Sequence, residues 1–192
     1  RLRGPAGVGG SARGEVSPPT QPPRQTSAAE MNEGRDAPVA AVAPWAAAGD
    51  GADIVITATN ATDPVFDGDL LDPGTHVTAM GQYHPERREL DTTTIERATY
   101  VPDLRSRALQ DAGSFLNAVE AGVVTEDHIH AELGEVLVGD APGRTAPDDI
   151  TVFDSGGTAI ETVAAAKMLY DRAVEAGVGE EIDFAPASEA MS

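Results

Sequence analysis

The stretch Asp53-Ile54-Val55-Ile56-Thr57-Ala58-Thr59-Asn60 carries the strongest fold signal in this chain. Three branched apolar residues follow one another and then give way to small hydroxyl and amide residues. An uninterrupted apolar run is typical of a strand that is buried on both faces, as in a parallel sheet covered by helices. Small polar residues at the carboxyl end of such a strand lie where open α/β sheets bind ligands. A plain core strand ending in a polar turn is the alternative interpretation.

The same pattern recurs downstream, and it predicts the fold class. Further short apolar segments lie at 76–81, 97–103 and 149–155. Helical segments are predicted at 91–96, 104–111, 115–120 and 130–137, and a longer helix at 159–176 is followed by Gly177. Strands separated by helices favour an α/β fold with a doubly wound, mostly parallel sheet.

Composition and charge exclude several classes of function. The chain has 192 residues and a net charge of -19, and Lys167 is its only lysine. Phosphate backbones require clustered Lys and Arg, so we expect no nucleic-acid partner. A dispersed acidic surface suits a salt-rich cytoplasm, which predicts a halophilic source. There is no cysteine, and we see neither a signal peptide nor an apolar run that could span a membrane, so a cytoplasmic protein with no membrane partner is expected.

The chain is predicted to divide into three parts. Residues 1–37 form an irregular segment, because Pro18, Pro19, Pro22 and Pro23 disfavour a helix interior or a central strand. Within this segment a short helix could occupy 27–33. Residues 38–158 form the α/β domain that holds the predicted sheet, and 159–192 form a C-terminal helix with a loose tail.

Gly7, Gly9 and Ala12 fit the dinucleotide pattern G-x-G-x-x-A. In that motif the glycines let the backbone approach a pyrophosphate, which a helix N-terminus then receives. The expected context is incomplete, because Leu2 is the only large apolar residue before Gly7 and prolines follow within six residues of Ala12. We interpret the motif as a degraded fingerprint.

Two other groups of residues could hold a ligand. Ser155 and Gly156 lie between the strand at 149–155 and the helix at 159–176, where close backbone approach by a ligand is possible, although a simple tight turn is the alternative. His128 and His130 are followed by Glu132 and Glu135, but the His-Glu-x-x-His spacing is absent, so no metal site is predicted.

The segment from Ala52 to about Ala176 resembles the ornithine cyclodeaminase/mu-crystallin family. The matching stretches are 52–59, Pro73-Gly-Thr-His76, Arg88-Glu-Leu-Asp91, 128–135, Gly143-Arg-Thr145 and Thr151-Val-Phe-Asp-Ser-Gly-Gly157. This resemblance implies a Rossmann-type domain with NAD or NADP as cofactor and a small amino or imino acid as substrate. By position, it implies that Thr57, Ala58 and Thr59 line the cofactor, that Gly81 lies near the nicotinamide, and that Ser155 contacts it.

The resemblance also implies an activity, namely conversion of ornithine to proline and ammonia or a related hydride transfer. The alternatives are an alanine dehydrogenase, a ketimine reductase, or a non-catalytic remnant that only binds nucleotide. Cyclodeaminases carry an aspartate base and a lysine in the loop after Gly81. Here Tyr83 and Arg87 occupy those positions, and His84 could act as the base.

The family has an N-terminal portion that builds its homodimer and binds the substrate carboxylate. None of it precedes Arg1, so we expect a truncated member with an incomplete first half of the sheet.

Overall fold

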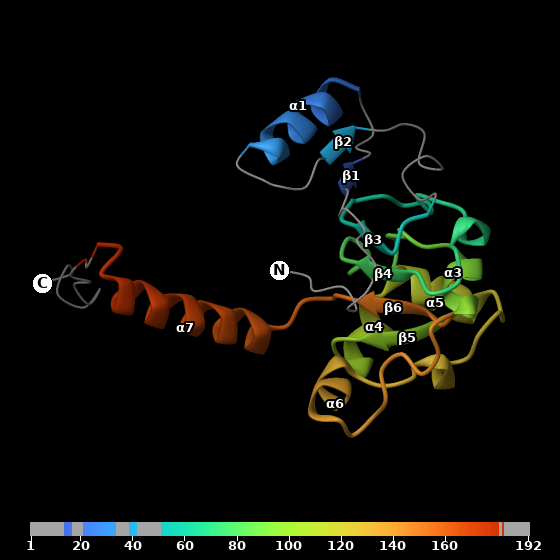
Figure 1. Cartoon of the computed structure of the whole chain (residues 1–192). Coiled ribbons are helices and arrows are strands. Elements are labelled where there is room, and N and C mark those ends of the chain that lie inside the picture. The colour runs from blue at the N-terminus through green and yellow to red at the C-terminus, as the bar shows by residue number, and fades with distance from the viewer. Residues whose placement is uncertain (1–13, 17–20, 34–38, 42–50, 181, 183–192) are drawn as a thin grey trace, which may run out of the picture. The chain divides into compact units, whose positions relative to one another are not determined.

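The computed structural model describes residues 14–16, 21–33, 39–41, 51–180 and 182 (Figure 1). The chain forms two compact units, residues 1–156 and 157–192. Gly7, Gly9 and Ala12 lie outside the described residues.

A four-stranded parallel sheet is the centre of the first unit. Its strands are β3 (Ile54–Thr57), β4 (His76–Ala79), β5 (Ala98–Pro102) and β6 (Ile150–Asp154), in the order β3-β4-β6-β5. The register pairs Thr57 with Ala79, and Ala79 with Asp154. All neighbouring strands run parallel, so the α/β prediction is confirmed and the carboxyl ends of the strands share one edge.

One face of this sheet is buried and is called the closed face below. Alternate residues of each strand point into it, among them Val55, Val77, Tyr100 and Val152. Residues of α3 (Thr92–Arg97), α4 (Arg105–Asp111) and α5 (Gly113–Glu120) join these strands in the hydrophobic core. The rings of Tyr100 and Phe115 stack with centroids 4.7 Å apart at the centre of this core.

The opposite face, called the open face below, is much less covered. Ile54 and Ile56 are 48% and 64% exposed, while His76, Thr151 and Phe153 are half-buried. The prediction that the strand at 53–60 is buried on both faces is therefore wrong for β3 within the described structure. Val55 and Thr57 are buried, whereas their neighbours face outward, so the strand is buried on one side only.

The short helix α6 (Leu133–Val138) follows the 3-10 turn η2 (Glu126–His128). The predicted start of this helix at residue 130 is wrong, because Glu132 and Glu135 form a reciprocal capping box that starts the helix at Leu133. Gly139 ends it in the left-handed conformation, with a φ of 86°. A second 3-10 turn, η1 (Gly68–Leu70), lies between β3 and β4.

A small β-α-β group precedes the main sheet in the chain. Strands β1 (Gly14–Val16) and β2 (Val39–Ala41) pair in parallel, with α1 (Gln21–Asn32) between them. The helix begins earlier than the predicted 27–33 and includes Pro22 and Pro23. Both prolines lie in its first turn, where backbone N–H groups have no intrahelical partner, so proline is tolerated there.

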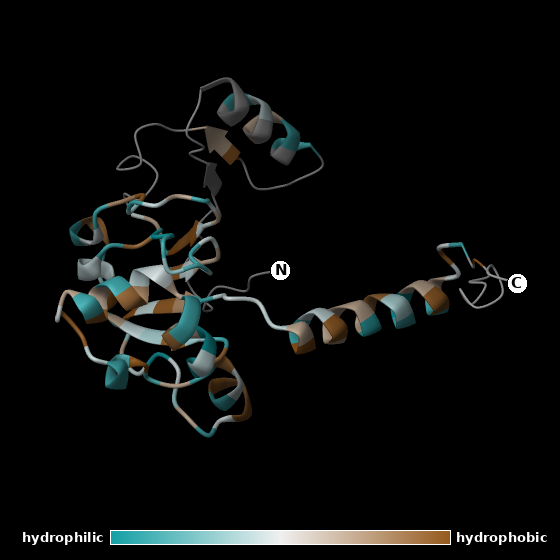
Figure 2. Ribbon diagram, turned by 180° about the vertical axis from the view of Figure 1, so that it is seen from behind, coloured by the Kyte–Doolittle hydropathy of each residue, from teal (hydrophilic) through white to brown (hydrophobic). Residues whose placement is uncertain are grey.

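The second unit contains α7 (Ala159–Ala176), as the sequence predicts. Thr158 and Glu161 form its capping box and Gly177 ends it with a φ of 63°. Apolar and polar residues alternate along its surface (Figure 2), and none of its residues is buried. No helix within the described residues is long and apolar enough to cross a membrane.

Candidate functional site

The carboxyl edge of the sheet brings together three segments that the sequence singles out. The Met80 amide donates to the Thr57 carbonyl at 2.9 Å, and the Ser155 amide donates to the Ala79 carbonyl at 2.9 Å. The ends of β3, β4 and β6 are therefore adjacent. This is the edge at which open parallel sheets bind ligands.

The carboxylate of Glu89 lies under this edge and is fully buried. It accepts hydrogen bonds from the Thr57 hydroxyl at 2.8 Å, from the Met80 amide at 3.1 Å and from the Gly81 amide at 2.6 Å. The amide of Thr59 also donates to it. Buried charges are tolerated when they are fully hydrogen-bonded, so this carboxylate holds the ends of β3 and β4 together.

Gly81 occupies a position that no larger residue fits. A Cβ atom placed there would lie 1.9 Å from the Thr59 carbonyl oxygen and 2.5 Å from a carboxylate oxygen of Glu89. Both contacts are far below van der Waals distance. The loop after β4 therefore approaches the loop after β3 closely because residue 81 lacks a side chain.

The predicted cofactor residues differ in how accessible they are. The side chain of Thr57 is only 2% exposed and its hydroxyl is engaged by Glu89. Ala58 and Thr59 are exposed at the edge, and Ser155 and Gly156 are half-buried. These four residues can present atoms to a ligand, whereas Thr57 contributes through the backbone that it fixes.

A second buried carboxylate, Asp154, ends β6 on the closed face. The Tyr100 hydroxyl donates to it, and Gln82 Nε2 donates to its Oδ2 at 2.7 Å. The pKa of Asp154 is raised to about 6. Burial is the largest cause and the charges of Asp103 and Glu89 add to it, while the hydrogen bonds from Tyr100 and Gln82 act in the opposite direction. Burial and the adjacent Asp154 also raise the pKa of Tyr100 well above its ordinary value.

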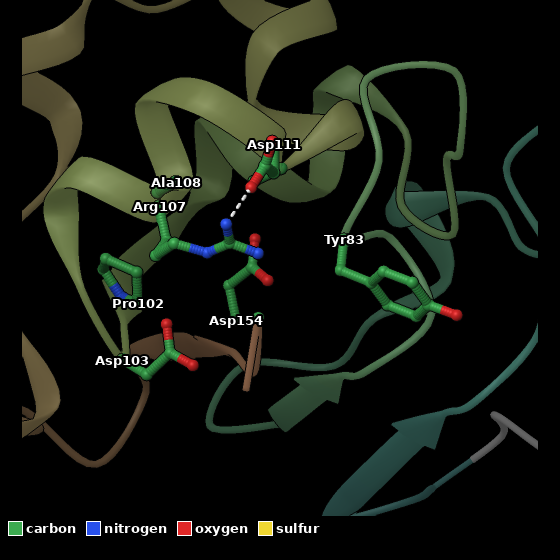
Figure 3. A pocket seen from close by; sticks show the side chains of 9 residues that line it. Tyr83, Pro102, Asp103, Arg107, Ala108, Asp111 and Asp154 are labelled. Atoms are coloured by element: carbon green, nitrogen blue, oxygen red, sulfur yellow. Dashed lines mark ion pairs between the residues drawn. The ribbon is translucent and has the colours of Figure 1, made fainter. Parts of the chain in front are cut away.

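A narrow pocket opens beside Asp154 (Figure 3), lined also by Tyr83, Asp103, Arg107 and Gly156. Arg107 forms an ion pair with Asp111 at 2.5 Å across its rim. The Tyr83 ring extends away from Asp154 in this view. The pocket therefore joins the acidic end of β6 to the loop that follows Gly81.

The predicted catalytic residues lie in that loop. The Tyr83 hydroxyl accepts a hydrogen bond from Arg87 at 2.9 Å, and the guanidinium carbon lies 5.0 Å from the ring centroid. His84 is exposed, and its Nδ1 accepts the Glu86 amide at 3.3 Å. Tyr83 and Arg87 form one pair, and their catalytic role stays a prediction.

The remaining motifs have structural partners. His128 Nε2 lies 2.7 Å from the Ile95 carbonyl oxygen and His130 Nε2 lies 2.8 Å from that of Pro142. Arg144 donates to the Asp149 carbonyl and to the Thr151 hydroxyl, and Thr145 donates its amide to the Asp149 carboxylate at 2.8 Å. The Gly143-Arg144-Thr145 motif thus organises the start of β6.

Sequence reasoning did not identify Glu89, Gln82 or Asp154 as site residues. Glu89 stands in the matched stretch Arg88-Glu-Leu-Asp91, but nothing in its spacing indicates burial. A signal was available for Asp154, since it ends a strand whose other alternate residues, Ile150 and Val152, are apolar.

A parallel α/β sheet with glycines and small polar residues at its carboxyl edge defines a protein of the Rossmann type. The sequence profile of the ornithine cyclodeaminase/mu-crystallin family matches residues 20–177. The chain belongs to this family.

Relatives with known names and structures agree with this assignment. A Δ1-pyrroline-2-carboxylate reductase of Bacillus cereus is 42% identical over 134 residues, which are 69% of this chain and 41% of the relative. The Thermococcus litoralis Δ1-pyrroline-2-carboxylate reductase, solved with NADH and L-proline, superposes with a TM-score of 0.82 at 34% identity, over 88% of this chain and 53% of that one.

An archaeal alanine dehydrogenase dimer with bound NAD has a TM-score of 0.73 at 32% identity, over 90% of this chain and 53% of that one. The chain therefore spans about two-fifths to one half of the length of these relatives.

Proposed function

We propose that this chain binds the nicotinamide half of NAD or NADP at the carboxyl edge of its sheet. The observation that carries the proposal is the convergence of Thr59, Gly81 and Ser155 at that edge, where Gly81 admits no side chain. A nicotinamide is a flat ring that needs close backbone approach and a few polar contacts, which this arrangement offers. The relatives solved with NADH and with NAD support the same cofactor.

For the reaction, we propose hydride transfer to a small imino acid in preference to cyclodeamination of ornithine. An iminium carbon accepts hydride directly, and the nitrogen is already protonated, so the step needs no carboxylate base at residue 83. Tyr83 is a poor general base at neutral pH. Similarity to pyrroline-2-carboxylate reductases favours a cyclic imino acid, and alanine dehydrogenase chemistry is the runner-up within the same class.

Cofactor binding is tested by titrating the protein with NADH and following nicotinamide fluorescence. We expect saturable binding that Ser155→Leu weakens, because the larger side chain fills the approach at the end of β6. Ser106→Leu, at an exposed serine of α4, is the matched control and should bind as the wild type does. Absence of saturation at millimolar NADH in the wild type would refute the proposal.

Turnover is a separate question, and we propose that the chain alone has little. Tyr83 stands in place of the aspartate base, and β1 begins at Gly14, where the dinucleotide pattern at 7–12 requires a helix to follow. A nucleotide-binding protein without turnover is therefore the second candidate. NADH oxidation with Δ1-pyrroline-2-carboxylate, NADH oxidation with pyruvate plus ammonia, and ammonia release from ornithine should all be near background. Robust turnover in any of these assays would decide for a complete enzyme.

A halophilic, cytoplasmic setting is also proposed, on the net charge of -19. Screening relieves the repulsion between like charges, so the melting temperature should rise from low salt into molar KCl. A melting temperature that is flat or falls over this range would remove the halophile argument. Formation of a homodimer, as expected from the family, can be measured by light scattering in the same buffers.

A further inference from the structure

We infer that Glu89 is a positioning residue for the nicotinamide, acting through the backbone of Thr59 and Gly81. The inference rests on the proposed cofactor site and adds a residue that neither motif spacing nor exposure indicates. Glu89 touches no exposed surface, so its effect on a ligand must pass through the groups that it holds.

The carboxylate joins the loop after β3 to the loop after β4, in addition to the backbone hydrogen bonds from Met80 to Thr57 and from Arg88 to Ala61. It receives the amide of Thr59 on one side and those of Met80 and Gly81 on the other. Without Glu89 the amides of Thr59 and Gly81 would lack this partner, which is costly for the buried Gly81 amide, whereas the Met80 amide also donates to the Thr57 carbonyl. Glu89 therefore sets the distance between the loop after β3 and the loop after β4.

The backbone at Glu89 is held in place by further hydrogen bonds. The backbone amides of Glu89 and Leu90 donate to Ser114 Oγ at 3.2 and 3.1 Å, and Ser114 lies in the first turn of α5. The Glu89 carbonyl accepts the Val65 amide at 3.0 Å. The position of the two loops is thus tied to a helix of the core.

A neutral amide cannot replace this carboxylate. A glutamine at residue 89 would offer one acceptor oxygen and would turn an NH2 group toward backbone N–H donors. Depending on which oxygen the NH2 group replaces, the amide of Thr59 or that of Gly81 would then lose its partner. Since the three amides are all engaged by Glu89, they are also not free to bind a phosphate, which suits this part of the edge to the uncharged ring end of the cofactor.

Asp91 provides a matched control two residues away. Its carboxylate also caps backbone amides, those of Gly68 at 2.8 Å and Thr94 at 2.7 Å, and it accepts the Thr94 hydroxyl at 2.7 Å. It caps α3 and takes no part in the carboxyl edge. Asp91→Asn and Glu89→Gln therefore each remove one negative charge from a carboxylate that accepts backbone amides. Asp91 does so at the start of α3, and Glu89 does so at the carboxyl edge.

The experiment compares Glu89→Gln with Asp91→Asn in the whole chain. We expect Glu89→Gln to raise the Kd for NADH roughly tenfold and to change the emission of bound nicotinamide, and Asp91→Asn to leave both unchanged. Amide hydrogen exchange at Thr59 or Gly81 should quicken in Glu89→Gln, while the amide of Val77 should stay protected. A folded Glu89→Gln variant with wild-type affinity and emission would overturn the inference.

Two other outcomes remain decisive. If Glu89→Gln does not fold, Ser114→Ala loosens the Glu89 backbone without touching the carboxylate and should raise the Kd by roughly threefold; unchanged affinity would overturn the inference. If the wild type does not bind NADH, the proposed function fails. Unchanged exchange at both Thr59 and Gly81 in Glu89→Gln would then refute the positioning role separately.

Discussion

The closed and open faces of the four-stranded sheet differ although the same strands supply both. The closed face buries Val55, Val77 and Tyr100 almost completely against α3, α4 and α5. On the open face, Ile54 and Ile56 are about half exposed or more. α6 contributes Leu133 and Val136 to a groove over β5 and β6 on this side.

The two faces therefore differ in how much apolar surface the described residues bury, and so in how much each face contributes to the stability of the fold. The closed face carries the core and the buried carboxylates of Glu89 and Asp154, so it also determines the geometry of the carboxyl edge. The open face carries apolar side chains that gain little from folding, because burial of apolar surface is the main favourable contribution. Stability and site geometry should therefore respond to changes on the closed face.

The largest effect is expected from removing a ring at the centre of the closed face. Phe115→Ala should lower the free energy of unfolding by about 3–5 kcal/mol, because Phe115 is fully buried and stacks on Tyr100. Ile56→Ala, at a side chain that is 64% exposed, should cost less than about 1 kcal/mol. Urea unfolding measures both. A loss at Ile56 that equals the loss at Phe115 would mean that the open face is covered in solution.

The next effect concerns pH and Asp154, which is buried on the closed face. Its folded pKa of about 6 lies above the ordinary value of 3.8, so the folded state binds the proton more tightly. The stability from this group is fully present below pH 3.8 and is lost as the pH rises through about 6, a change of up to about 3 kcal/mol. Asp154→Asn should remove this dependence between pH 4 and 7. Parallel pH profiles for the wild type and the variant would show that Asp154 titrates normally.

Alanine substitutions at two glycines compare the crowded carboxyl edge with an uncrowded position in α6. Gly81→Ala should destabilise the fold by about 1–3 kcal/mol, because the new methyl group meets the Thr59 carbonyl oxygen and Glu89. Gly134→Ala in α6 meets nothing within 4 Å and should stabilise by up to about 1 kcal/mol. Thermal unfolding of the two variants distinguishes them, and a neutral Gly81→Ala would show that the two loops are farther apart than described.

The smallest effect concerns His76 on the open face. Burial, and then the charge of Arg144, lower the pKa of His76 below 6.5. Its contribution to stability is therefore complete above pH 6.5 and is lost as the pH falls through the lowered pKa, opposite in sign to Asp154. Arg144→Gln should move the pKa of His76 part of the way back toward 6.5, measured by NMR of the ring protons. An unchanged pKa would leave burial as the sole cause.

Much of the fold could be predicted from the sequence, because apolar runs and glycines report on local structure. The four strands, α3, α4, α5 and α7 lie within a few residues of their predicted positions. The first residue of α6 was missed, because a capping box between Glu132 and Glu135 decides it. The exposure of Ile54 and Ile56 was missed because a branched apolar run has the same composition whether one face or both are covered.

The candidate site was predicted in part. The positions of Thr59 and Ser155 after strands, and the family resemblance for Gly81, single out these residues, and the structure brings the three strand ends together. Their contact with a cofactor stays a prediction. Glu89 could not be placed, because its partners are 8 to 32 residues away in sequence and most of them are backbone amides. A carboxylate that binds main-chain groups leaves no pattern of side chains to recognise.

NMR mapping of cofactor binding tests the central claim most directly, because it compares the carboxyl edge with the open face in one titration. Adding NAD to the isotope-labelled chain should shift the amide signals of Thr59, Gly81, Ser155 and Gly156 in a saturable way, while those of Ile54 and Ile56 stay in place. Shifts confined to the open face, or no shifts at millimolar NAD, would contradict the assignment of the carboxyl edge as the nicotinamide site.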